Sequence, residues 1–179
     1  MNAAEFRSAW EGAGDRLYQY PVETISTANL PAATQDFLVA GGLPQEAAPF
    51  LTFGPETLDW LRQPGDDLDR LYALGSDGSG DPLAVDDCGR VWQIDHERPH
   101  RKVLVNTSVA ALAQCLLAYR TLIAEAVTVG GEDAFLDGRI ARHAIDAFYR
   151  SIDGVDREAA GPGTFWGQEL SRLMEVATD

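Results

Sequence analysis

The chain has 179 residues, of which 45% are hydrophobic and 23% charged, and its formal net charge is −14. This length suits one globular domain whose core needs no disulfide or metal. Nucleic acids and anionic membranes attract basic surfaces, so the charge argues against both as direct ligands. A negative surface instead steers a chain toward basic proteins, although solubility alone would also explain it.

Localisation is predicted from three features. Residues 1–7 lack the basic and then apolar pattern of a signal peptide. The longest apolar stretch, 109–119, is interrupted by Gln114 and is much shorter than a membrane span. The two cysteines, Cys88 and Cys115, are interpreted as a turn thiol and a small buried side chain. We therefore expect a cytoplasmic protein.

The N-terminal part of the chain predicts helices. Residues 3–12 have an amphipathic pattern. An edge segment is predicted at 18–22, because Pro21 cannot donate a hydrogen bond in the middle of a sheet. A second helix is predicted over 31–40, with its proline at the first helical position and the glycines 41–42 ending it.

A series of short apolar segments separated by Gly/Asp turns follows, which is typical of an antiparallel meander. Parallel strands would need a dozen or so residues between them. The predicted strands are 71–74, 82–85, 91–94 and 103–105, with turns at 77–80 and 86–89.

The remaining chain predicts helices over 109–126, capped by Ser108 or Thr107, then over 140–151 and 165–176. Strands grouped between helices predict an α+β class with a central antiparallel sheet of about four to six strands. The expected single domain has N-terminal helices in about 1–45, the sheet in about 49–106 and C-terminal helices in about 108–179.

His96-Glu97-Arg98-Pro99-His100 spells H-E-x-x-H, the zinc signature of metalloproteases. That chemistry needs both histidines one helical turn apart on one face. Pro99 disfavours a helix and the residues lie between two predicted strands, so a hairpin loop is the preferred interpretation. A hydrolase using His96, Glu97 and His100 is kept as a disfavoured alternative, which metal analysis would test.

Residues 77–81 resemble the start of a calcium-binding loop, with oxygen atoms at alternate positions. An EF-hand needs glycine sixth and glutamate twelfth, where this chain has Pro82 and Cys88. A hairpin turn explains the glycines and the aspartates equally well. We predict no catalytic residue, no metal and no cofactor.

Several segments, taken in chain order, resemble the SUKH superfamily. Leu74–Asp86 (LGSDGSGDPLAVD) resembles its central hairpin and Gly89–His96 (GRVWQIDH) its next strand; Val105–Ser108 (VNTS), followed by a Leu-rich helix, resembles its strand-to-helix junction. The helix before the sheet is matched by Leu30-Pro31, Phe37-Leu38 and Gly42-Leu43-Pro44. Ile152-Asp153 and Phe165-Trp166 are similar to the tail of the fourth SUKH immunity group.

The resemblance implies an α+β domain with a central antiparallel sheet and no catalytic residues. Many bacterial members are immunity proteins that protect the producing cell by binding the toxin of a polymorphic toxin system, often a nuclease or a nucleic-acid deaminase. Our first hypothesis is therefore an immunity protein whose partner is a cognate toxin with a basic surface. The alternative is a non-catalytic interaction module with a cellular, non-toxin partner, and the neighbouring genes would distinguish the two.

The candidate partner contacts are charged residues at the hairpin ends: Asp77, Asp81, Asp86, Asp87, Asp95, Glu97 and Arg98. Carboxylates there would guide a basic toxin, while buried aromatic and arginine anchors supply most affinity in such complexes. Trp92 is a weaker candidate because a strand tryptophan usually packs in the core. We expect the same of Trp10, Trp60 and Trp166.

Overall fold

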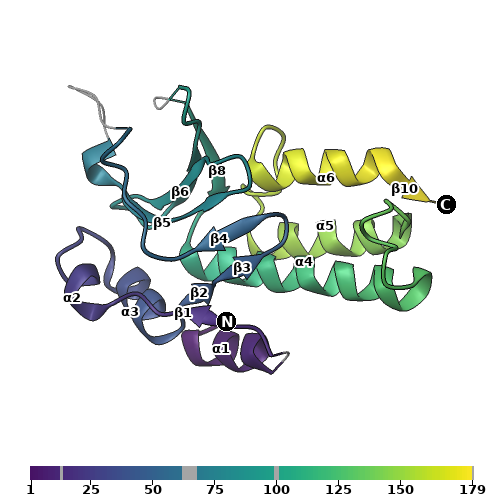
Figure 1. Cartoon of the computed structure of the whole chain (residues 1–179), viewed down its shortest axis with the longest axis horizontal. Helices are drawn as coiled ribbons and strands as arrows, with labels where there is room; N and C mark the ends of the chain where they lie inside the picture. Colours follow the sequence, from purple (N-terminus) through teal and green to yellow (C-terminus); the bar gives the residue numbers. More distant parts are fainter. Residues whose placement is uncertain (13, 62–67, 99–100, 179) are drawn as a thin grey trace.

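The computed structural model describes residues 1–12, 14–61, 68–98 and 101–178. A six-stranded antiparallel sheet runs in the order β3-β4-β5-β6-β7-β8, with helices before and after it in the chain (Figure 1). Its strands are β3 (Glu46–Ala47), β4 (Leu51–Phe53), β5 (Tyr72–Asp77), β6 (Pro82–Val85), β7 (Val91–Ile94) and β8 (Lys102–Asn106). The predicted α+β class with a central antiparallel sheet is confirmed.

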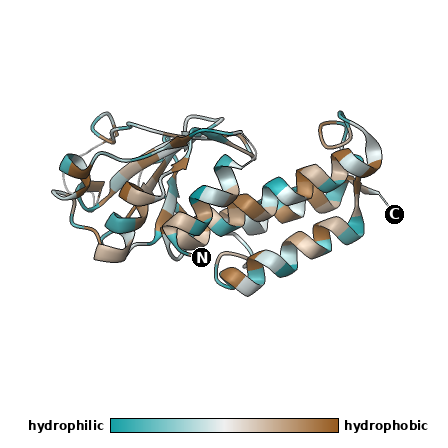
Figure 2. Ribbon diagram, turned by 90° about the horizontal axis from the view of Figure 1, so that it is seen from below, coloured by the Kyte–Doolittle hydropathy of each residue, from teal (hydrophilic) through white to brown (hydrophobic). Residues whose placement is uncertain are grey.

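The described residues form six α-helices: α1 (Ala3–Glu11), α2 (Val22–Ile25), α3 (Ala32–Ala40), α4 (Val109–Gly130), α5 (Arg142–Val155) and α6 (Phe165–Val176). A 3-10 turn, η1 (Leu68–Arg70), precedes β5. Helix α4 contacts α1, α3 and α5, and α5 contacts α6. The three C-terminal helices extend beyond the sheet, and the C-terminus lies at the far end of this arm (Figures 1 and 2).

Two short strand pairs lie outside the main sheet. Strand β1 (Leu17–Tyr18) pairs antiparallel with β2 (Leu43–Pro44), and β9 (Ile140–Ala141) pairs parallel with β10 (Ala177–Thr178). The second pair explains why α5 begins at Arg142 and not at residue 140 as predicted. Its parallel strands are joined through two whole helices, as parallel pairing requires.

Side-chain caps fix where the helices begin. Asn2 and Glu5 form a reciprocal capping box at the start of α1. Ser108 caps α4 by accepting the N–H of Ala111 at 3.1 Å, and Thr164 caps α6, whose predicted bounds are confirmed. Pro31 is the residue before α3 and not its first helical residue, because its ψ of 142° is extended.

Both faces of the sheet are buried. Leu74, Leu83 and Val85 belong to the main core with the helices. Ala73, Ala84 and Ile94 belong to a second cluster, formed with Leu58, Leu61, Leu68 and Leu71 of the segment that joins β4 to β5. All four residues of β6 are therefore buried, and this is why it is a continuous apolar run without alternation.

Helix α4 is longer than predicted. It is the one described helix that is long and apolar enough to cross a membrane, yet half of its most apolar 18-residue window is buried inside the fold. Its buried side chains, including Leu112, Leu116 and Tyr119, belong to the main core. The hydropathy of α4 is thus explained by its place as a core helix.

Candidate partner-binding surface

Three aspartates, Asp77, Asp86 and Asp95, stand nine residues apart in the chain and each closes a hairpin turn in the same way. The Oδ1 atom of each accepts the N–H of the residue two positions ahead, Ser79 at 2.8 Å, Cys88 at 2.9 Å and Glu97 at 3.1 Å. A second N–H donates to the same oxygen, from Asp81, Arg90 and Arg98 respectively. Each of these aspartates thus stabilises its own turn, the local role that aspartate favours in turns.

The second oxygen of each carboxylate is also a hydrogen-bond acceptor. Asp77 Oδ2 accepts from Gln93 Nε2 at 2.5 Å, Asp86 Oδ2 from Trp92 Nε1 at 2.8 Å, and Asp95 Oδ2 from Arg98 Nε at 2.9 Å. These carboxylates therefore tie each turn to a neighbouring side chain. Their predicted contact with a partner stays a prediction, but substituting them would disturb the hairpins as well.

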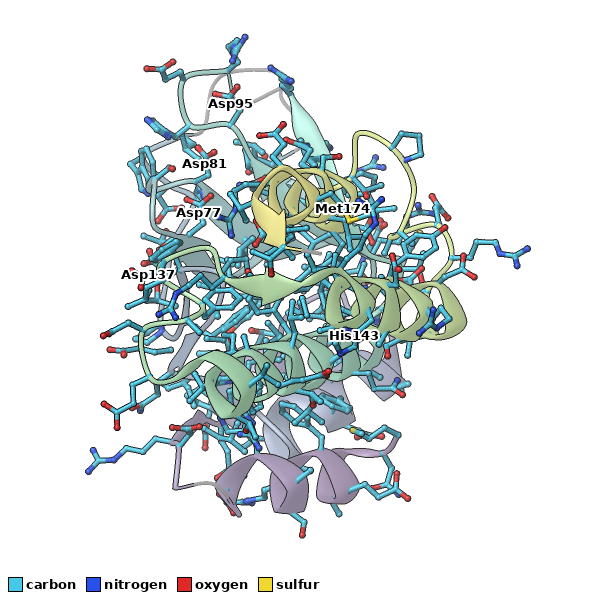
Figure 3. All side chains as sticks on the ribbon, turned by 90° about the vertical axis from the view of Figure 1, so that its right-hand side faces the viewer. Asp77, Asp81, Asp95, Asp137, His143 and Met174 are labelled. Carbon is cyan, nitrogen blue, oxygen red and sulfur yellow. The ribbon has the colours of Figure 1, made fainter. Side chains whose placement is uncertain are left out.

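The seven predicted contact residues lie at two opposite ends of the sheet. Because antiparallel strands alternate in direction, the turns β3–β4, β5–β6 and β7–β8 share one end, which we call the hairpin-tip end (48–50, 77–81 and 95–98). It carries Asp77, Asp81, Asp95, Glu97 and Arg98, and Figure 3 shows the first three following one another along one side of the molecule, beside α6. Asp86 and Asp87 lie in the β6–β7 turn at the other end.

His96 joins two turns of the hairpin-tip end. Its Nδ1 lies 2.7 Å from Asp81 Oδ1, and its backbone N–H donates to the same oxygen at 3.0 Å. This hydrogen bond raises the pKa of His96 above its ordinary value. Residues 96–98 form a turn and not a helix, as the hairpin interpretation of H-E-x-x-H predicts, while Pro99 and His100 lie outside the described residues.

At the opposite end, one ligand atom each of Asp86, Asp87 and Cys88 lie within 4.8 Å of one another. This closeness follows from the turn, since Asp86 already accepts from two backbone N–H groups and from Trp92. The Cys88 thiol is exposed. A hydrogen bond to Asp87, together with the charges of both aspartates, raises its pKa.

A groove of about 350 Å³ lies between the β3–β4 turn and α6, lined by Pro49, Phe50, Gln93, Phe165, Gln168, Glu169 and Arg172. Glu169 is a buried carboxylate that accepts from Arg172 Nη2 at 2.6 Å and Nε at 2.9 Å, and from the hydroxyl of Tyr119. The pKa of Tyr119 is raised, first by burial and then by Glu169. This ion pair gives the α6 wall of the groove a fixed shape.

Phe50, at the rim of this groove, is unusual in both exposure and backbone conformation. It is 77% exposed, and its φ of 57° makes it the one described non-glycine residue with positive φ. A bulky side chain there costs roughly 1–3 kcal/mol in strain. Sequence reasoning missed Phe50 and the groove, because an aromatic residue beside the apolar Leu51 is typical of a core strand.

The tryptophans differ in burial. Trp10 and Trp166 are buried, as expected, and Trp92 is half-buried against the second cluster. The expectation for Trp60 is wrong, because it is 59% exposed in the segment after β4. Its neighbours Leu58 and Leu61 are buried in its place.

Two segments that carry the SUKH resemblance, Val105–Ser108 and Phe165-Trp166, meet in a buried polar network with Asp156, a residue outside the resemblance. Trp166 Nε1 donates to Asn106 Oδ1 at 2.9 Å, and Asn106 Nδ2 donates to Asp156 Oδ2 at 3.1 Å. The backbone N–H of Thr107 donates to the same carboxylate at 2.7 Å. This part of the pattern is thus explained by folding, since buried polar groups need partners.

The chain was also compared with known proteins. No curated protein and no solved structure matches it. A family model described as SUKH-4 immunity protein matches residues 4–172, which is nearly the whole chain and spans the sheet, the groove and the buried network. The chain therefore belongs to the SUKH-4 immunity protein family.

Proposed function

We propose that this chain is the cytoplasmic immunity protein of a bacterial polymorphic toxin system, and that it neutralises a cognate toxin by binding it, without chemistry of its own. The observation that carries the proposal is the family match over residues 4–172. The two free cysteines suit a reducing compartment.

The charge of the chain supports a nucleic-acid-targeting toxin as the partner. Enzymes that act on nucleic acid need basic surfaces to bind phosphates, and a partner with a net charge of −14 complements such a surface. Complementary charge chiefly accelerates association and selects the partner, so an immunity protein of this kind captures its toxin rapidly.

The test is co-expression of the full chain with the toxin-like product of a neighbouring gene. We expect growth to be restored and a complex to co-purify, with an association rate that falls steeply as salt rises from about 50 to 500 mM, because screening weakens charge steering. A toxin that remains lethal and does not co-purify would contradict the proposal. An association rate that does not change with salt concentration would contradict the proposal that the toxin has a basic surface.

A further inference from the structure

We propose that the toxin seats a basic segment in the groove beside α6, with Phe50 as the apolar anchor of the complex. The inference rests on the proposed function and adds the face of the molecule that binds. Its starting point is Phe50, a residue that is 77% exposed and whose backbone is held in the left-handed region. Such strain is concentrated at ligand-binding sites.

The position of Phe50 is set by its neighbours. Gly78 of the β5–β6 turn lies directly against it, since a Cβ at that glycine would be 3.0 Å from Phe50 Cβ. The ring therefore stands over a turn that leaves it room, at the rim of a groove of about 350 Å³. A large exposed aromatic side chain beside a hollow is the kind of residue that is enriched in protein interfaces.

The lining of the groove suits a segment that carries both apolar and polar groups. Pro49 and Phe165 are apolar, whereas Gln93 and Gln168 are polar, and their Nε2 atoms donate to Asp77 Oδ2 and to Gly163 O. The Glu169–Arg172 pair in its α6 wall is already satisfied, with nitrogen–oxygen distances of 2.6 and 2.9 Å. The wall is thus preorganised, which lowers the entropy cost of binding.

The charges around the groove select a basic occupant. Asp77, Asp81, Asp95 and Glu97 stand at the hairpin-tip end, whose residues include one arginine, Arg98, while the Arg172 guanidinium in the groove wall is paired with Glu169. A second copy of the chain would bring another −14 to the same place, and the two would repel. A cationic toxin segment fits the charge and the groove together.

The experiment measures the dissociation constant of the full chain with the toxin domain that the wild type neutralises. Phe50→Gly removes the ring and suits the positive φ, so the variant stays folded; we expect its binding to weaken by about thirtyfold or more. Leu136→Ala is the matched control, because Leu136 is 80% exposed in the segment between α4 and α5. It should bind as the wild type does.

A second pair of variants tests the groove without touching Phe50. Gln168→Lys places a cation on the α6 wall and should slow association with a basic segment, whereas Thr128→Lys adds the same charge on the exposed surface of α4 and should alter it little. If Phe50→Gly bound the toxin as tightly as the wild type, or if the two lysine substitutions had equal effects, the groove would not be the binding face. The proposed function would still stand. A wild-type chain that binds no toxin would overturn both.

Discussion

Trp166 donates its indole N–H to the side-chain oxygen of Asn106 at 2.9 Å, and neither residue has exposed surface. Asn106 ends β8 and Trp166 is the second residue of α6, so this bond fixes the last helix to the edge of the sheet. Asp156, at the end of α5, completes the connection by accepting from Asn106 and Thr107. Because α6 forms one wall of the groove, the buried network also positions that wall.

The first prediction compares two aspartates near the end of α5. Asp156→Ala leaves the donors of Asn106 and Thr107 without their acceptor, so we expect the free energy of unfolding to fall by about 3–5 kcal/mol. Asp153→Ala removes only a solvent-exposed pair with Arg157 at 3.5 Å and should cost less than about 1 kcal/mol. Urea denaturation measures both. If Asp156→Ala lowered the free energy of unfolding no more than Asp153→Ala does, the buried network would not stabilise the fold.

Much of the fold follows from local sequence signals. The bounds of β6 and β7 and the turns at 77–80 and 86–89 were predicted, because Asp and Gly specify turns within a few residues of the chain. Strands β3 and β4 were not predicted, because strands of two or three residues are too short to show an alternation of apolar and polar residues. Strand β5 extends past Leu74 only because Gly75 lies opposite Phe53, where a Cβ would come within 1.9 Å of Thr52 O.

The candidate site was less predictable. The carboxylates in the hairpin turns were identified by their residue type. Which of them lie at the same end of the sheet depends on the direction of each strand, which residue type does not reveal. A glutamate in a helix, such as Glu169, is expected to be exposed to solvent. Its burial depends on contact with Tyr119, which lies fifty residues away along the chain. No local pattern marks Phe50, since its exposure is set by the turn of a neighbouring hairpin.

The second prediction concerns the strain at Phe50. With a φ of 57°, glycine is favoured over any residue with a Cβ. Phe50→Gly should therefore be more stable than Phe50→Ala by about 1 kcal/mol. Urea denaturation of the two variants at equal pH gives this difference directly. Equal stabilities, or a more stable alanine variant, would mean that the backbone there is relaxed.

The third prediction concerns pH. The hydrogen bond to Asp81 raises the pKa of His96, so the pair stabilises the fold fully below the unfolded pKa of about 6.5 and loses this contribution as pH rises through the folded pKa. NMR titration should show a lower pKa for His96 in Asp81→Asn, with His100→Gln and His143→Gln used to assign the three histidine resonances. The stability advantage of the wild type over Asp81→Asn should shrink over the same range. A pKa that is unchanged in the variant would contradict this account.

The fourth prediction concerns the two thiols. The hydrogen bond to Asp87, with the negative charges of Asp86 and Asp87, raises the pKa of Cys88 and so lowers the share of reactive thiolate at any given pH. Asp87→Asn should therefore accelerate alkylation of Cys88 by iodoacetamide, most clearly at low salt, while Glu97→Gln at the other end of the sheet should not. Burial raises the pKa of Cys115 to about 12, so this thiol should react only after unfolding and serves as an internal control. Mass spectrometry of the time course resolves the two sites, and an Asp87→Asn rate equal to that of the wild type would show that the turn carboxylates do not control the thiol.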